Sequence, residues 1–356
     1  MKEQLKKIFE SFTDSGIPGY DCLILENGEE ILRITHGVSD GEGTPMRGDE
    51  RYFLYSSSKP ITCTAALILC DAGSLGLDEP LGKYMPEFSE MSVRDGDKIR
   101  KAERQIKVRD LFTMTAGFSY DTDSSMLGRC KEETGGRCQT REVMRYLAEE
   151  PLLFEPGDRW EYSLCHDVLA ALVETVSGVR FSEFVRENIF LPLGMYDSTF
   201  AQTPESVGKV CTQFFMNREG KRSYPGEKKN WFIIGTEYES GGAGCISTVD
   251  DYANFCEALR LGRLLRPETM EMFSTDQLTA AQKRSYWAKS DGYGLGSAIW
   301  NLGNGKKLFG WGGVAGFYPL TVLGGEMTFV YAQQVLNTDC DFRNFQMRDF
   351  MLENGR

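Results

Sequence analysis

The sequence predicts an α+β fold, in which an α/β sandwich built on an antiparallel sheet is joined to a mainly helical lobe. Near the N-terminus, two segments rich in Ile, Leu and Val, residues 20–26 and 29–37, flank Asn27-Gly28, a pair typical of a hairpin turn. Near the C-terminus, the composition indicates three successive strands, at residues 307–311, 317–323 and 327–335. Helical periodicity dominates the chain between these two groups of strands.

The expected helices follow from the spacing of apolar residues. The first, over residues 1–12, has one apolar face formed by Leu5, Ile8, Phe9 and Phe12. Helical spacing returns at about residues 57–81 and 140–189, and an apolar face in the second segment stops at Gly178, as expected of a helix end. Thr248-x-x-Asp251 has the pattern of a capping box and predicts another helix start. The final helix is expected at residues 341–353.

Strands at both ends of the chain, with helices between them, predict a discontinuous domain. Residues 1–75 and 235–356 are expected to form the sandwich lobe, with the antiparallel sheet flanked by both terminal helices. Residues 76–234 are expected to form the helical lobe. The cleft between two lobes is the usual place for a ligand, so we expect the active site there.

Composition and charge exclude several classes of function. The chain has 356 residues and a net charge of -12, which argues against a nucleic-acid partner. No apolar stretch reaches the roughly 20 residues of a membrane helix, and the first residues lack the pattern of an export signal. We therefore expect a cytoplasmic protein whose ten cysteines are free thiols. Two histidines and no Cys-x-x-Cys pair predict neither a metal site nor a cofactor, and the oligomeric state is not indicated.

The first candidate for chemistry is Ser56-x-x-Lys59. This spacing places a hydroxyl and an amine on neighbouring points of one helical turn, where the lysine can relay the serine proton. Pro60 is tolerated only in the first turn of a helix, so a helix start is expected at these serines, where its amides favour an oxyanion. A serine cap followed by a solvated lysine is the alternative interpretation. A second copy of the pattern, Ser206-x-x-Lys209, contains glycine and is not followed by the pattern of a buried helix.

Two further segments complete the candidate site. Tyr162, in Trp160-Glu161-Tyr162-Ser163, can act as a general base beside a cation, or it is a half-buried structural tyrosine. Trp311-Gly312-Gly313 begins a glycine-rich stretch in which the amide of Val314 can face the amide of Ser56 as a second oxyanion donor. The alternative for this stretch is a glycine-rich bulge in a sheet.

The order and spacing of these three segments resemble the serine β-lactamase/penicillin-binding-protein superfamily. The class C β-lactamase-like branch is the most similar, and within it the family VIII carboxylesterases. The resemblance implies a β-lactamase/transpeptidase-like fold with the active site between the lobes. It also implies Ser56 as the nucleophile, Lys59 as its proton partner, and Tyr162 as the base that activates first the serine and then water.

Two departures from the β-lactamase pattern bear on the substrate. Leu164 stands where a class C β-lactamase has Asn, and Trp311-Gly312-Gly313 replaces Lys-Thr-Gly, which removes the cation that meets a substrate carboxylate. We therefore expect a carboxylesterase-like serine hydrolase for small, neutral acyl esters, with a small-molecule ester or amide as its partner. Trp160 and His166 are further candidates for substrate binding, although both residue types are often structural in such places.

Three other activities stay open at this stage. The site could serve a β-lactamase or a D-amino-acid or D,D-peptidase, or it could transfer the acyl group to an acceptor other than water. A penicillin-binding sensor domain without turnover is the third. Turnover of a lactam, of an ester, or of neither would separate these hypotheses.

Overall fold

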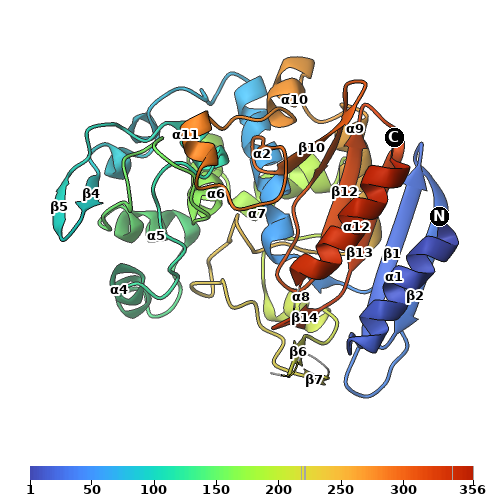
Figure 1. Ribbon diagram of the computed structural model, residues 1–356. Helices are drawn as coiled ribbons and strands as arrows, with labels where there is room; N and C mark the ends of the chain where they lie inside the picture. The colour runs from blue at the N-terminus through green and yellow to red at the C-terminus, as the bar shows by residue number, and fades with distance from the viewer. Residues whose placement is uncertain (218, 220–221, 339, 356) are drawn as a thin grey trace.

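The computed structural model describes residues 1–217, 219, 222–338 and 340–355, and it is built around a seven-stranded antiparallel sheet. The strands lie in the order β2-β1-β13-β12-β11-β10-β9 (Figure 1). In that order, their bounds are Glu29–Gly37, Gly19–Glu26, Met327–Ala332, Tyr318–Leu323, Lys306–Gly310, Ala298–Gly303 and Gly292–Tyr293. Strands from the two ends of the chain therefore share one sheet, as the sequence predicts.

The N-terminal hairpin forms where the sequence places it. Asn27 and Gly28 have positive φ values of 53° and 83°, the backbone geometry of a tight hairpin turn between β1 and β2. On its other side β1 pairs with β13, with Asp21 opposite Ala332 and Glu26 opposite Met327. The hairpin is thus built into the sheet rather than appended to it.

Alternate residues of β1 face the two sides of the sheet. Cys22 and Ile24 pack in a cluster with Phe9 and Phe12 of α1 (Lys2–Asp14) and with residues of α12 (Cys340–Asn354). Leu23 and Leu25 belong to a second cluster on the opposite face, where α9 (Val249–Arg260) contacts β1, β12 and β13. Figure 1 shows α1 and α12 side by side over the strands, which makes the predicted sandwich of helices around a sheet.

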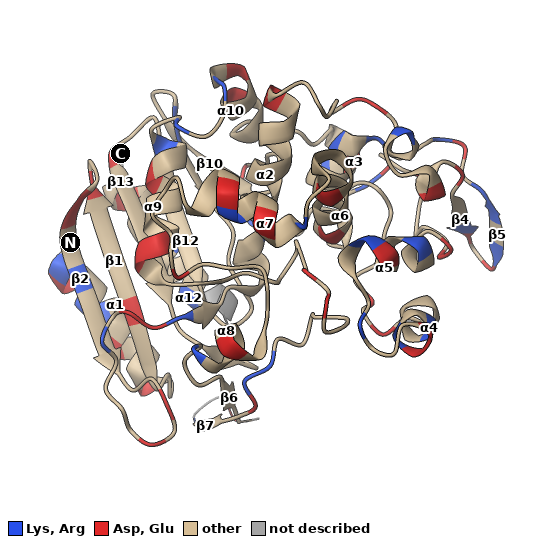
Figure 2. Cartoon of the chain, turned by 180° about the vertical axis from the view of Figure 1, so that it is seen from behind, with Lys and Arg blue, Asp and Glu red and all other residues tan. Residues whose placement is uncertain are grey.

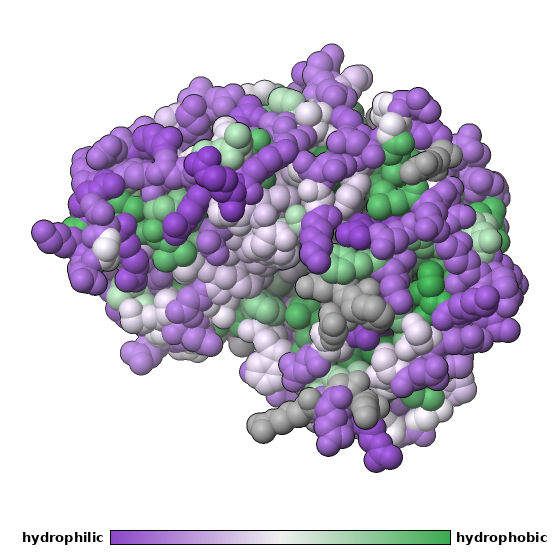
Figure 3. Space-filling model, viewed as in Figure 1, coloured by the Kyte–Doolittle hydropathy of each residue, from purple (hydrophilic) through white to green (hydrophobic). Residues whose placement is uncertain are grey.

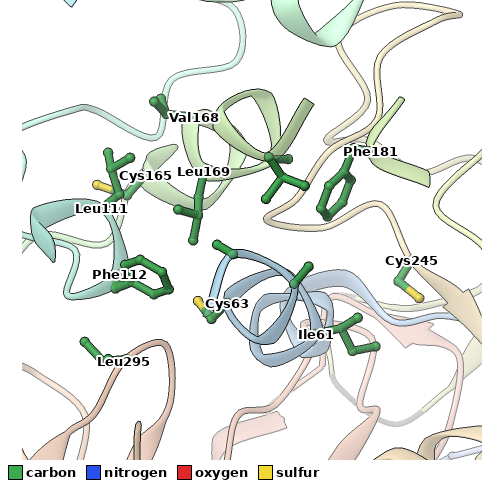
Figure 4. Packing of buried hydrophobic residues seen from close by; sticks show 14 of the residues in the cluster. Ile61, Cys63, Leu111, Phe112, Cys165, Val168, Leu169, Phe181, Cys245 and Leu295 are labelled. Carbon is green, nitrogen blue, oxygen red and sulfur yellow. The ribbon is translucent and has the colours of Figure 1, made fainter. Parts of the chain in front are cut away.

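Helix α2 (Lys59–Asp71) lies at the centre of the molecule and is buried along most of its length. It contacts α6 (Cys165–Ser177), and Figure 4 shows Ile61 and Cys63 of α2 among residues of surrounding elements. Helix α6 ends at Gly178, whose φ of 76° gives the left-handed end predicted there. One apolar cluster includes residues of α2, α6, α9 and the sheet. The lobe boundaries expected at residues 75/76 and 234/235 stay a prediction.

The remaining elements surround this centre. The other helices are α3 (Val108–Phe112), α4 (Ser125–Glu133), α5 (Thr140–Leu147), α7 (Phe181–Val185), α8 (Pro204–Gly208), α10 (Pro267–Phe273) and α11 (Ala280–Lys283), with shorter helical turns η1 (Tyr55–Ser58), η2 (Leu81–Lys83), η3 (Pro86–Phe88) and η4 (Arg186–Phe190). Three small sheets pair β3 (Tyr52–Phe53) with β8 (Ile246–Ser247), β4 (Ser92–Asp95) with β5 (Lys98–Lys101), and β14 (Val335–Leu336) with β6 (Phe214–Met216) and β7 (Ser223–Pro225). Figure 2 shows that charged residues lie mostly on outer helices and loops, whereas β12 and β13 carry none.

The structure differs from the sequence expectations in several places, of which three concern the main sheet and helix α9. The strand predicted at 327–335 breaks after Ala332, because the Gln334 side chain turns to accept from Phe53 N at 2.8 Å and the chain then joins another sheet. Strands β9 and β10 at the sheet edge were not predicted. Thr248 caps α9 by accepting from Asp251 N at 3.1 Å, but the Asp251 carboxylate bonds to Ser198 rather than completing the capping box.

Two general features complete the description. Among the residues described, no helix has both the length and the apolar character needed to cross a bilayer. The nine cysteines whose side chains the structure describes are free thiols.

Candidate active site

Ser56 is presented to solvent by a strained turn just before α2. Tyr55 has a φ of 48°, which is unfavourable for a bulky side chain, and its buried ring is held by a hydrogen bond from its hydroxyl to Gln213 Oε1. Ser56 is part-exposed, whereas Ser57 and Ser58 are fully buried. Pro60 lies in the first turn of α2, so the helix begins where the sequence predicts.

Lys59 and Tyr162 both converge on the Ser56 hydroxyl. Tyr162 Oη donates to Ser56 Oγ at 2.6 Å, and Lys59 Nζ donates to the same oxygen at 3.3 Å. Lys59 Nζ also lies 4.6 Å from the centre of the Tyr162 ring. The three predicted catalytic residues, from two separate segments, are therefore within direct proton-transfer contact.

The ammonium of Lys59 is buried and is held by a backbone carbonyl. Its Nζ donates to Gly242 O at 2.7 Å, and Thr62, one turn along α2, donates to Gly241 O at 2.7 Å. Asp167, behind this segment, accepts from Ser240 Oγ at 2.6 Å. Burial raises the pKa of Asp167 above its ordinary value, against the lowering effects of the Ser240 hydrogen bond and the Lys59 charge.

The two serines that follow Ser56 fasten the site to its surroundings. Ser57 Oγ contacts Trp311 O at 2.8 Å and Phe317 O at 3.0 Å, which ties the loop between β11 and β12 to η1. Ser58 Oγ accepts from Cys245 N at 3.0 Å and so connects η1 to β8. The run of three serines thus has one member in the pocket and two in the supporting structure.

The glycine-rich loop after β11 lies directly against the backbone of this turn. A Cβ on Gly313 would meet Leu54 O at 2.1 Å, so only glycine allows this approach. Gly313 N donates to Phe317 O at 2.8 Å and closes the loop. Val314, 45% exposed, lines the same pocket as Ser56, together with Gly312 and Gly313.

A pocket of about 470 Å³ opens beside Ser56 and Tyr162. Its wall is largely aromatic: Trp311 stacks on Tyr162 with ring centres 5.8 Å apart, and Trp311 Nε1 donates to Tyr162 Oη at 3.4 Å. Trp287, 60% exposed, contacts both rings from the rim. The other residues of the lining are Ala288, Lys289, Ala298, Trp300, Gly310, Gly312, Gly313, Val314, Tyr318, Thr338, Asn344 and Phe345.

Two predicted binding residues do not reach this pocket. Trp160 is 1% exposed and packs edge-on against Trp287 and Tyr293, so it supports the aromatic wall from behind. His166, in the first turn of α6, is fully buried with Nε2 3.5 Å from Cys63 Sγ and 3.3 Å from Phe112 O. Burial lowers the pKa of His166 to about 3, which leaves a neutral imidazole in the core.

Several pocket residues were not predicted from the sequence. Trp287, Lys289 and Trp300 come from the segment around the sheet edge, and Asn344 and Phe345 come from α12. None lies in a recognisable motif, and only their packing in three dimensions brings them to Ser56. No group of His, Cys, Asp and Glu suited to a metal ion occurs among the residues that the structure describes.

Comparison with known sequences supports the same superfamily. A family model described as Beta-lactamase matches residues 5–339. The chain belongs to the Beta-lactamase family. Within it, Esterase EstB from Burkholderia gladioli is 30% identical over 288 residues, which are 75% of this chain and 72% of that protein. The acyltransferase mokF from Monascus pilosus is 30% identical over 67% of this chain and 60% of its own length.

A solved structure extends the likeness to three dimensions. EstCE1, described as a hydrolase with promiscuous acyltransferase activity, matches with a TM-score of 0.81 and 25% identity, over 98% of this chain and 97% of its own. These comparisons confirm the predicted superfamily and the α+β fold. The family match and the similarity to EstB and EstCE1 together show that the chain is a serine hydrolase with esterase-like function.

Proposed function

We propose that the chain hydrolyses small acyl esters through an acyl-enzyme on Ser56. The observation that carries this proposal is the contact of the Ser56 hydroxyl with Tyr162 Oη at 2.6 Å and Lys59 Nζ at 3.3 Å, inside a pocket open to solvent. Ser56 is the nucleophile, and Tyr162 and Lys59 manage its proton. A cytoplasmic location and the two-lobed division of the chain belong to the same proposal.

In the acylation step, Tyr162 acts as a phenolate that has given up its own proton beside the Lys59 ammonium. Ser56 Oγ attacks the ester carbonyl while its proton passes to the Tyr162 phenolate oxygen. The buried Lys59 ammonium offsets the negative charge that develops on the two oxygens during this transfer. The backbone amides of Ser56 and Val314 stabilise the oxyanion of the tetrahedral intermediate. The ester C–O bond then breaks, and the alcohol leaves with the proton that Tyr162 returns.

In the deacylation step, Tyr162 takes a proton from water, and the hydroxide attacks the acyl carbonyl. The bond to Ser56 Oγ breaks, the acid is released, and Ser56 recovers its proton. The Trp311 and Trp287 rings line the pocket with apolar surface, which suits an uncharged acyl group next to the reacting carbon. No metal or cofactor takes part in this proposed sequence.

Acyl transfer is the second candidate. EstCE1 is described as a hydrolase with promiscuous acyltransferase activity, and mokF is described as an acyltransferase. Transfer requires that an alcohol reach the acyl-enzyme in place of water, and the exposed Trp287 rim offers apolar surface for it. Adding an alcohol to the ester assay should then yield a new ester, whereas a strict hydrolase yields only the acid.

The test compares the wild-type chain with Ser56→Ala on a p-nitrophenyl ester of butyric acid. We expect Ser56→Ala to lose activity by about a thousandfold or more. Ser206→Ala is the matched control, because Ser206 belongs to the second Ser-x-x-Lys, is part-exposed and, from α8, donates to Ala201 O in the preceding segment. Mass spectrometry after a short reaction should find the butyryl group on Ser56. Equal activity in both variants would refute the assignment.

A further inference from the structure

Lys289 brings a positive charge to the pocket from outside every motif considered so far. It lines the same pocket as Ser56 and follows the rim residue Trp287 along the chain. Among the lining residues that the structure describes, Lys289 is the one with a charged side chain. The chain has 52 acidic and 40 basic residues and is therefore negatively charged overall. The described lining of the pocket, with one lysine and no carboxylate, has the opposite sign of charge.

The ammonium of Lys289 has an aromatic neighbour rather than an acidic one. Its Nζ lies 4.8 Å from the centre of the Phe345 ring in α12. Among the side chains that the structure describes, which do not include those of residues 339–342, no carboxylate lies within ion-pair distance of this lysine, whereas Arg348, which also lies over Phe345, is paired with Asp349. The charge of Arg348 is therefore compensated, whereas the described side chains give the charge of Lys289 no acidic partner.

The backbone at Lys289 is held in place. Its carbonyl oxygen accepts from Trp300 Nε1 at 2.8 Å and from the Arg348 guanidinium at 3.4 Å. These contacts join the segment to strand β10 and to α12. The ammonium is thus carried by a fixed point of the wall, although the side chain itself is exposed. Figure 3 shows residues of near-neutral hydropathy across the middle of the face that is also seen in Figure 1, with mostly hydrophilic margins.

We propose that the pocket prefers ester substrates that carry a carboxylate away from the reacting carbonyl, and that Lys289 binds this carboxylate. The inference rests on the proposed function and refines its substrate class. The expectation of neutral substrates came from the loss of the lysine of Lys-Thr-Gly at Trp311, and Lys289 supplies a cation from a different part of the fold. The exposed ammonium at the pocket wall attracts an anion electrostatically, and salt screens this attraction. Lys289 takes no part in bond making.

The kinetic test uses esters matched in size but not in charge. On the acyl side, the p-nitrophenyl monoester of glutaric acid is compared with p-nitrophenyl valerate. On the alcohol side, 4-carboxyphenyl butyrate is compared with phenyl butyrate. We expect Lys289→Gln to lower the ratio of kcat/KM for charged over neutral ester by about tenfold in one of the two pairs. The pair that responds shows which side of the ester bond faces Lys289.

Two controls accompany this comparison. Lys98→Gln removes the same charge from an exposed position in the β4–β5 hairpin, outside the pocket, and should leave the ratio unchanged. Lys289→Arg retains the charge and should restore most of the preference. Added salt should weaken the preference of the wild-type chain, because exposed charges are screened. A ratio that is the same in wild type and Lys289→Gln for both pairs would overturn the inference, while hydrolysis that depends on Ser56 would leave the proposed function standing.

A binding measurement keeps the inference testable without turnover. In a Ser56→Ala chain, 4-phenylbutyrate and its neutral amide are titrated while tryptophan fluorescence is followed, since three of the five tryptophans line the pocket. We expect Lys289→Gln to weaken binding of the acid by about tenfold relative to the amide. Equal effects on acid and amide would contradict the role of Lys289, whatever the catalytic result.

Discussion

Replacing Ser56, Ser57 and Ser58 one at a time by alanine should give three different outcomes, although the residues are adjacent and the change is the same. Ser57→Ala removes a buried hydroxyl that contacts Trp311 O and Phe317 O. Phe317 O keeps the hydrogen bond from Gly313 N, but Trp311 O loses its contact with the hydroxyl. A buried polar group without its partner costs about 1–3 kcal/mol of unfolding free energy.

Ser58→Ala should be similarly destabilising, because the buried amide of Cys245 donates to Ser58 Oγ. Ser56→Ala should change the free energy of unfolding by less than about 1 kcal/mol. Ser56 is part-exposed, and after its removal Lys59 keeps its hydrogen bond to Gly242 O while Tyr162 keeps the stacking on Trp311. Activity and stability should therefore separate along three consecutive residues.

The assay pairs denaturant unfolding with hydrolysis of the butyrate ester. Ser56→Ala should lose activity at near-normal stability. Ser57→Ala should lose stability and also about tenfold in kcat/KM, because the loop that carries Val314 is no longer tied to η1. Ser58→Ala should lose stability with a smaller effect on rate. If Ser57→Ala and Ser58→Ala unfold like the wild type, the supporting role inferred for these hydroxyls is wrong.

Two further predictions concern Tyr162 and the half-buried carboxyl of Glu174 in α6. Tyr162→Phe keeps the stacking on Trp311 but removes the 2.6 Å contact to Ser56. The value of kcat/KM should therefore fall by about 100- to 10,000-fold, with little change in melting temperature. A loss in kcat/KM below tenfold would argue against proton transfer by Tyr162. Burial raises the pKa of Glu174 from 4.5 to about 7, so the folded chain retains this proton longer than the unfolded chain and loses stability as the pH rises between these values. Glu174→Gln, which keeps an acceptor for Phe181 N, should therefore increase the free energy of unfolding at about pH 8, by roughly 3 kcal/mol at most, and not at about pH 4. Equal changes at both pH values in denaturant unfolding would contradict the assignment.

The parts of the site that the sequence predicted depend on local rules. Ser56 and Lys59 are one helical turn apart, and Pro60 marks the helix start, so their proximity follows from short-range geometry. The meeting of Ser56 with Tyr162 has no such local cause. It was implied by the family resemblance, and the structure places the two oxygens in contact.

The predictions that failed depend on which way a residue faces. His166 and Tyr162 are four positions apart, but α6 begins at Cys165, and its first turn directs His166 towards Cys63 in the core. Lys289 was missed for the opposite reason, because its segment has no distinctive pattern and gains meaning only when α12 packs beside it. The break after Ala332 likewise depends on a side chain, that of Gln334, finding a partner in distant Phe53.

The pairing of β1 with β13 has a consequence for how the chain acquires its structure during synthesis. The hairpin of β1 and β2 emerges from the ribosome before the other strands of its sheet, and β13, which covers the free edge of β1, is made much later. The contact between Gln4 and Glu353 joins positions 349 residues apart. Until then, an apolar strand edge and the inner face of α1 lack their final partners, which favours contacts between nascent chains. We expect soluble yield in cells to depend strongly on chaperone supply and growth temperature, even for variants whose finished fold is stable.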